Sequence, residues 1–239
     1  MNNELLSKTL AQIVNENHRA ASVFEKYNLD FCCKGKRSLE IACREKNLES
    51  RAIADEIENM QQLNPFNDFN SFSLTQLVEY IVSTHHAYTK KELVQIFAYL
   101  QKISSKHGER HAELYRIFEA FAALKEELEM HMRKEELILF PRIEELDNAT
   151  GQSNELSMSI EAPITVMEDE HQHAGDLMEK IRSYSSNYTP PEDACTTYRL
   201  TFAALQALEK DLHQHVHLEN NILFPKALKL FRDNKTLLA

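Results

Sequence analysis

Glycine and proline are scarce in this sequence, with 4 Gly and 6 Pro among 239 residues. Both residues interrupt helices, so their scarcity leaves room for long helical segments. Leu, Ala, Glu and Lys are abundant, and 27% of the residues are charged, a composition typical of helical soluble proteins. We therefore expect an all-α fold.

Three further absences limit the function. Four Cys are too few for a disulfide scaffold in a chain of this length. No run of about 18 apolar residues occurs, which argues against a membrane span, and Met1 to Ala20 lack the apolar region of a signal peptide. A cytoplasmic location is the resulting expectation. Positive charge is in the minority, and the net charge of −10 argues against nucleic acid as a partner.

The chain divides into three predicted parts. Residues 1–62 contain several short helical segments, such as the one that Ser38 caps, and none is long enough to be stable alone. Residues 63–72 contain Pro65 and three Asn and lack periodicity, which predicts a linker. Residues 73–239 carry long amphipathic patterns and form the predicted main domain.

Four segments of this main domain each show an inward stripe with helical spacing. The first stripe is Leu74, Leu77, Ile81, His85, Tyr88, Glu92, Ile96, Tyr99 and Ile103. The second is Leu114, Ile117, Phe121, Leu124, Leu128, His131, Glu135 and Ile138. The third is Ile164, Met167, His171, Ala174, Met178 and Ile181, and the fourth is Leu205, Leu208, Leu212, His215, Glu219 and Ile222. Short connections, one at Gly108, predict an up-down four-helix bundle.

One block occurs twice. His131 to Pro141 and His215 to Pro225 both read His-x-x-x-Glu followed by apolar residues ending in Leu-Phe-Pro. Residues i and i+4 share one face of a helix, so each block directs an imidazole and a carboxylate to the same place.

The inward polar residues predict a metal centre formed by His85, His131, Glu135, His171, His215 and Glu219. A single inward His is more often a hydrogen-bonded core residue. Four on four helices, two with an in-phase Glu, instead favour two metal ions, because ions would satisfy all six buried groups. Nitrogen and bridging carboxylate ligands without thiolate suit iron or manganese better than structural zinc.

The remaining polar candidates carry weaker signals. His86, His173, His213 and His217 are out of phase with the stripes, and we expect them in solvent. A rotation of the fourth helix would still let His213 and His217 take part in the site. Glu168 and His171 form a Glu-x-x-His pair, which makes Glu168 a candidate for orienting a ligand. This pair occurs once, whereas ferritin-like iron oxidases need it twice.

Cys32 and Cys33 are adjacent in a predicted loop, and two readings stay open. The pair could be packed structurally beside Phe31. Alternatively, Lys34, Lys36 and Arg37 would favour thiolates, and a thiolate pair could receive or deliver a soft metal ion. A disulfide between neighbours would be strained and easily reduced.

Several motifs together resemble the iron–sulfur cluster repair di-iron proteins, the repair-of-iron-centres family. They are Tyr27 to Lys36, His131 to Pro141, Pro163 to His171 and Leu218 to Pro225. The resemblance covers nearly the whole chain and implies a hemerythrin-like domain behind a small N-terminal domain. The family's di-iron ligands correspond to the same six residues. A family histidine also matches His107, but a straight helix would place it roughly 33 Å from His85.

The resemblance implies a cytoplasmic stress-response protein that holds two iron ions. Its clients would be iron–sulfur proteins damaged by oxidative or nitrosative stress, which it would restore by releasing iron. Apart from the resemblance, Cys32 and Cys33 are a candidate pair for thiol or iron transfer. Two alternatives stay open: reduction of nitric oxide at the di-iron centre, and hemerythrin-like binding or sensing of oxygen or nitric oxide. The sequence also leaves open whether the chain forms a homodimer.

Overall fold

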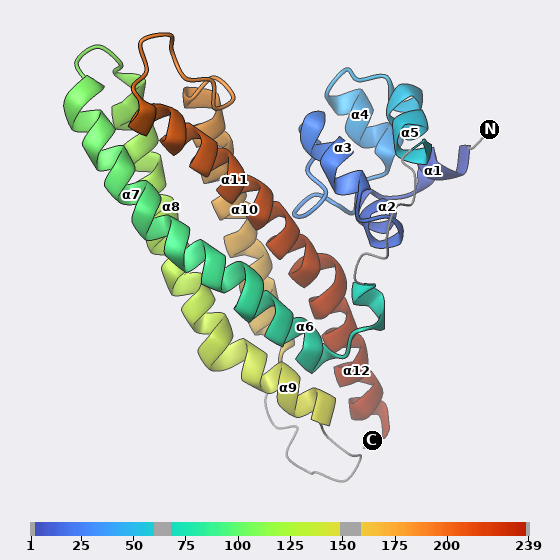
Figure 1. The fold of residues 1–239 in the computed structure, drawn as a ribbon. Coiled ribbons are helices and arrows are strands. Elements are labelled where there is room, and N and C mark those ends of the chain that lie inside the picture. Colours follow the sequence, from blue (N-terminus) through green and yellow to red (C-terminus); the bar gives the residue numbers. More distant parts are fainter. Residues whose placement is uncertain (1–2, 60–67, 149–158, 238–239) are drawn as a thin grey trace. The chain divides into compact units, whose positions relative to one another are not determined.

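The structure is a computed structural model that describes residues 3–59, 68–148 and 159–237. Regular structure within these ranges is helical, without strands, and Thr9 and Ser38 form an isolated antiparallel bridge (Figure 1). None of the described helices combines the length and the apolar character needed to cross a membrane. The all-α prediction is confirmed.

The chain forms two compact units. Unit 1 consists of Met1–Leu77 together with His213–Ala239, and unit 2 consists of Val78–Leu212. Residues from both ends of the sequence thus belong to one unit. The predicted domain boundaries at residues 62 and 73 stay predictions. Part of the predicted linker, residues 63–67, lies outside the described residues.

Unit 1 begins with short helices. They are α1 (Asn3–Ser7), α2 (Leu10–Glu16), α3 (Ala20–Lys26), α4 (Leu39–Glu45) and α5 (Ser50–Glu58). Thr9 and Gln12 form a reciprocal capping box at α2, and the Ser38 side chain accepts the Ile41 N–H at the start of α4. The 3₁₀ helix η1 (Phe69–Ser71) and the start of α6 (Leu74–Tyr80) follow. Such short helices depend on a shared core for their stability.

The end of the chain completes unit 1. Val216, near the end of α11 (Thr196–Leu218), packs in the same core as Phe24, Phe31 and Leu39. The segment continues as η4 (Glu219–Leu223) and α12 (Phe224–Leu237). Lys226 Nζ donates hydrogen bonds to the carbonyl oxygens of Asn70 (2.9 Å) and Phe72 (2.6 Å). The N-terminal helices and the C-terminal segment therefore share a core and polar contacts.

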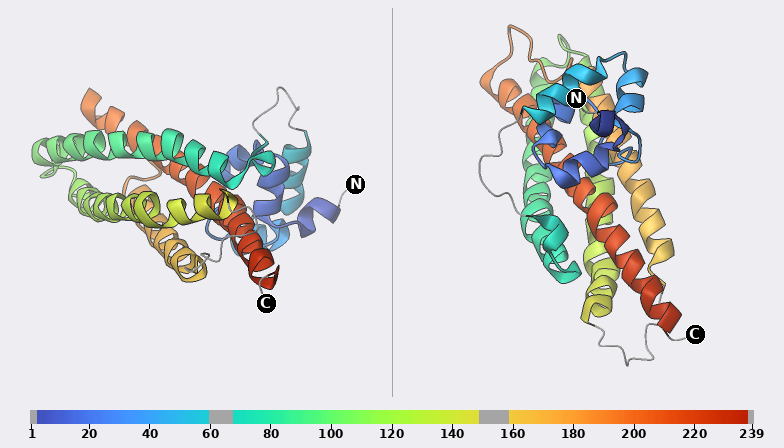
Figure 2. Two further views of the ribbon diagram at one scale, coloured as in Figure 1. Left: turned by 90° about the horizontal axis from the view of Figure 1, so that it is seen from below. Right: turned by 90° about the vertical axis from the view of Figure 1, so that its right-hand side faces the viewer.

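Unit 2 is a four-helix bundle. Its helical segments are η2 (Ile81–His86), α7 (Ala87–His107), α8 (Glu113–Lys134), η3 (Glu135–Leu139), α9 (Phe140–Asn148), α10 (Glu161–Tyr184) and α11 as far as Leu212. Helix α8 packs against both α7 and α10 (Figure 2). The core between them is apolar and includes Leu100, Phe121, Ile181, Phe202 and Leu208. The bundle prediction is confirmed.

Both short connections of unit 2 lie at the same end of the bundle (Figure 1). Arg110 and His111, between α7 and α8, contact Asp193, between α10 and α11, each at 3.0 Å. A Cβ at Gly108 would lie 2.3 Å from the Tyr115 ring, so this close approach requires glycine. Gly108 ends α7, as the sequence predicts.

Three helices widen into π-helical segments: η2, η3 and η4. A π segment adds one residue to a turn, and such bulges are frequent at functional sites. The extra residue rotates the following helix by about 100° relative to the expected stripe. Tyr88 and Glu92 are therefore only half-buried, and Thr89 and Leu93 occupy the core instead. Helix α10 has no π segment, and its six predicted inward residues are all buried.

Candidate metal centre

Three predicted ligands meet in unit 2. His131 Nε2 lies 3.3 Å from Glu135 Oε2 and 2.9 Å from His171 Nε2. The ligand atoms of all three residues lie within 4.8 Å of one another, and no side chain among them is more than 2% exposed. Helix α8 supplies His131, η3 begins at Glu135, and α10 supplies His171.

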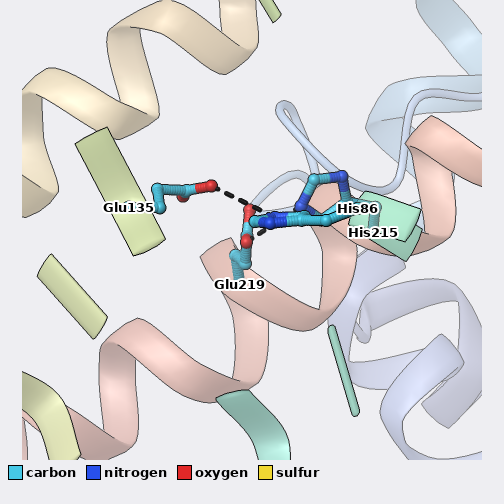
Figure 3. Close-up of side chains that lie close together, drawn as sticks. All are labelled: His86, Glu135, His215 and Glu219. Atoms are coloured by element: carbon cyan, nitrogen blue, oxygen red, sulfur yellow. Dashed lines mark hydrogen bonds and ion pairs between the residues drawn. The ribbon is translucent and has the colours of Figure 1, made fainter. Parts of the chain in front are cut away.

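His86 approaches the same carboxylate. Its Nε2 lies 3.4 Å from Glu135 Oε2 (Figure 3). The His86 side chain is fully buried, and its ring is stacked on Phe140. The expectation that His86 is in solvent is therefore wrong. The cause is η2, which rotates the chain so that His86 joins the inward series of Thr89 and Leu93. Two consecutive His at a helix position facing a core are a sequence signal that could have raised this alternative.

His85 is also buried, at 3% exposure, and it contacts a different carboxylate. Its Nδ1 lies 3.0 Å from Asp211 Oδ1, and its ring meets Tyr80 edge-on. The prediction of His85 as a ligand thus remains a prediction, with His86 as a neighbour that contacts Glu135 directly.

The remaining two predicted ligands form a pair in unit 1. His215 Nε2 lies 2.9 Å from Glu219 Oε1 (Figure 3). The two residues are 1% and 0% exposed. They are four positions apart, at the end of α11 and the start of η4. This is the geometry expected of the His-x-x-x-Glu block.

Carboxylates form hydrogen bonds with the Nδ1 atoms of two imidazoles in unit 2. Glu170 Oε2 lies 3.0 Å from His131 Nδ1, and Glu136 Oε1 lies 2.7 Å from His86 Nδ1. A proton on each Nδ1 leaves Nε2 with a lone pair, the arrangement found behind metal-binding histidines. Sequence reasoning proposed Glu168 for such a role and missed Glu170, two residues further along α10.

These anchoring carboxylates stay ionised. Hydrogen bonding from His131, supported by Lys134, lowers the pKa of Glu170 to about 2 despite partial burial. Burial alone would raise the pKa of Glu136, but hydrogen bonds from Lys90 and His86 outweigh it and lower that pKa. Negative charge is therefore fixed behind both rings.

The donor set fits a metal ion. Two Nε2 atoms that are 2.9 Å apart can share only one proton, while a cation can accept a lone pair from each. Glu135 and Glu219 are fully buried, and a buried carboxylate costs several kcal/mol unless it is compensated by charge or hydrogen bonds. Imidazole nitrogen with carboxylate oxygen is a set that suits iron.

The other histidines differ in their exposure to solvent. His173 is largely exposed, as expected, whereas His217 is buried, so the expectation of solvent exposure is wrong there. Burial lowers the pKa of His217 to about 4, so its imidazole is neutral. His213 is partly buried, with Nδ1 2.5 Å from Glu25 Oε1. His107 lies against the Tyr198 ring, at the connection end of unit 2.

Comparison with known proteins shows the family to which this chain belongs. The hemerythrin HHE cation binding domain matches residues 77–227, and ScdA_N, a domain of unknown function (DUF542), matches residues 6–61. The iron-sulfur cluster repair protein YtfE of Enterobacter sp. (strain 638) is 35% identical over 219 residues, which cover 92% of this chain and 96% of the relative. The chain belongs to the hemerythrin-domain family of iron–sulfur cluster repair proteins.

Two further iron-sulfur cluster repair proteins are similar to this chain to the same degree. The YtfE proteins of Escherichia coli O157:H7 and Shigella boydii serotype 4 (strain Sb227) are each 35% identical over 210 residues, covering 88% of this chain and 91% of theirs. The family resemblance inferred from the motifs is confirmed. The matched HHE domain includes all six predicted ligands, and its description as cation-binding agrees with the buried His and Glu groups.

Proposed function

We propose that this chain binds two iron ions and repairs damaged iron–sulfur clusters in client proteins by donating iron to them, in the cytoplasm. The single observation that supports the iron site most strongly is Glu135, a fully buried carboxylate with His131 and His86 within 3.4 Å. The repair role rests on relatives that carry that name and match about nine tenths of the chain.

The proposed ligands are His131, Glu135, His171, His215 and Glu219, with one of the two neighbours His85 and His86. The contact with Glu135 favours His86. Each of the two repeated His-x-x-x-Glu blocks offers a carboxylate and an imidazole, the donor types that suit iron.

The protein's own residues prepare the ligands. Glu136 and Glu170 orient the imidazoles and keep Nε2 available, and Lys90 and Lys134 balance their charge. Iron held by these imidazoles and carboxylates would be the ion that the protein donates to a client. Release of Fe²⁺ to a client transfers an ion and needs no electron.

Anaerobic loading with ⁵⁷Fe and Mössbauer spectroscopy test the site. The wild type should hold two coupled irons per chain, and Glu135→Ala and Glu219→Ala should each lose that coupled centre. Glu129→Gln is a matched control on α8, because Glu129 is half-exposed and pairs with Lys125 at the surface. A zinc-filled wild type, or iron retained by both Ala variants, would contradict the proposal.

A repair assay tests the function itself. Iron-loaded protein is added to a [4Fe–4S] hydro-lyase damaged by nitric oxide, and recovery of hydro-lyase activity is compared with recovery by the same amount of free Fe²⁺. We expect recovery with the wild type in the presence of a chelator that prevents recovery by free iron. Catalytic nitrous oxide formation by the reduced protein without client recovery would assign it to nitric oxide reduction instead.

A further inference from the structure

The loop between α3 and α4 brings a second set of donor atoms together in unit 1. Cys32 Sγ lies 3.8 Å from Cys33 Sγ and 3.3 Å from Asp30 Oδ1. One ligand atom from each residue lies within 4.8 Å of the others. Cys32 is buried and Cys33 is partly exposed, so the group can be reached from one side.

The backbone holds this loop in a defined shape. Asp30 Oδ1 accepts the N–H groups of Cys32 (3.2 Å), Cys33 (3.0 Å) and Lys34 (3.3 Å). A Cβ at Gly35 would lie 2.2 Å from the Phe31 carbonyl oxygen, so the turn is too tight for any other residue. The two sulfurs are therefore presented on a rigid turn rather than on a loose segment.

The spacing fits a metal ion better than a disulfide. A disulfide needs its sulfurs about 2.05 Å apart. Two thiolates bound at about 2.3 Å to a tetrahedral ion are about 3.8 Å apart, which is the distance between Cys32 Sγ and Cys33 Sγ. A carboxylate oxygen of Asp30 lies within 4.8 Å of both sulfurs and offers a third donor atom.

We propose that Cys32, Cys33 and Asp30 bind one divalent transition-metal ion, Fe²⁺ or Zn²⁺, at a site separate from the His and Glu centre. Three protein ligands leave one position open on a tetrahedral ion, as in sites that exchange ligands rather than in closed structural sites. The contact with Cys33 and burial both raise the pKa of the Cys32 thiol, so a Cys32 thiolate is unfavourable without a cation beside it. A bound divalent ion would neutralise the negative charge of the thiolate. Binding therefore releases protons.

The position of the site suggests its use. Asn221, in η4, donates from Nδ2 to the carbonyl oxygens of Cys32 (3.1 Å) and Phe31 (3.4 Å). Glu219 begins the same segment two residues earlier. An ion held by the cysteines is thus next to a chain segment that carries an iron ligand. This step, a transfer site for donated iron, rests on the proposed function, whereas the binding site itself does not.

Titration of the reduced full-length protein with Co²⁺ tests the binding site. We expect thiolate-to-cobalt charge-transfer absorption in the wild type, and its loss with at least about tenfold weaker binding in Cys32→Ser and Cys33→Ser. Cys195→Ser is the control, because Cys195 is exposed and belongs to unit 2. Absence of the absorption in the wild type at stoichiometric Co²⁺, or its survival in both variants, overturns the proposal.

Two further measurements keep the outcomes distinct. Zinc X-ray absorption of the wild type should show two sulfur neighbours, which requires no variant to fold. In Glu135→Gln and Glu219→Gln the thiolate absorption should persist while the coupled iron signal is lost. Loss of the thiolate absorption in both Gln variants would show that the cysteines do not form a separate site.

Discussion

His85 and His86 are consecutive in the sequence, and both are buried because a helix turn of η2 contains one added residue. In a regular α-helix, consecutive residues point about 100° apart, and only one of them faces the core. Segment η2 lets the earlier stripe end at His85 and the later stripe begin at His86. Each ring then has its own carboxylate, Asp211 for His85 and Glu136 for His86.

This arrangement predicts different effects for two matched substitutions. His86→Asn should weaken iron binding at least about tenfold, because it removes the nitrogen that faces Glu135. His85→Asn should leave most of the iron in place. Iron per chain after anaerobic loading and desalting measures both. Iron loss in His85→Asn alone would restore the sequence-based choice of His85.

Glu170 predicts a pH effect on the iron-free protein. Its pKa is about 2 in the folded state, against about 4.3 when unfolded. A lowered folded pKa means that the stabilisation is present above the unfolded value and is lost as pH falls toward the folded value. The Tm gap between wild type and Glu170→Gln should be largest above about pH 5 and should close toward about pH 2.

Differential scanning calorimetry across that pH range measures the Tm gap. Glu129→Gln serves as the exposed control on α8, for which we expect a small gap. A gap for Glu170→Gln that does not change with pH would show that the carboxylate acts by packing rather than by charge.

At the scale of elements, sequence periodicity succeeded along the regular helix α10 and failed by one residue after η2 and on η3, whereas on η4 the predicted Glu219 and Ile222 are buried. All six stripe residues of α10 are buried, including His171. On η3, Ile138 was expected inside but is 46% exposed, and Leu139 is buried in its place. Periodicity at 3.6 residues per turn cannot register an i to i+5 turn, because both helix types are built from the same apolar residues.

The π segments predict the effect of a deletion. Removal of Ile138 should convert η3 to regular α-helix and keep the phase of α9, so helix content and Tm should change little. Glu135 would lose its present position, so iron binding should be lost. Circular dichroism, calorimetry and iron analysis measure the three quantities.

Deletion of Glu126 is the control for this prediction, because α8 is regular there. It should rotate every later residue of the helix by about 100° and destabilise unit 2 strongly. Equal loss of stability in the two deletions would contradict a structural difference between η3 and regular helix.

At the scale of the molecule, unit 1 joins residues that lie about two hundred positions apart in sequence. Asn221 contacts the Cys32 carbonyl, and Val216 packs among the N-terminal helices. Composition and periodicity concern neighbours in sequence, so they predicted the helices and bundle but could not predict this pairing of chain ends. The metal-binding family could be inferred, because its motifs are local.

The two units predict separable regions of hydrogen exchange. Phe31→Ala removes a side chain that is 1% exposed in the core of unit 1 and should destabilise that unit by about 3–5 kcal/mol. Exchange should accelerate in α2–α5 and α12, with little change in α7 and α8. Phe121→Ala, in the core of unit 2, should show the converse pattern. Uniform acceleration in both variants would indicate one cooperative unit.

The composition of unit 1 has a consequence for synthesis. The N-terminal helices leave the ribosome long before Val216 and Asn221, which they contact in the folded protein. The core of the N-terminal helices therefore lacks Val216 until that later segment has been made. A chain halted before residue 213 would lack the second segment of unit 1, so synthesis past that segment precedes complete assembly of the unit.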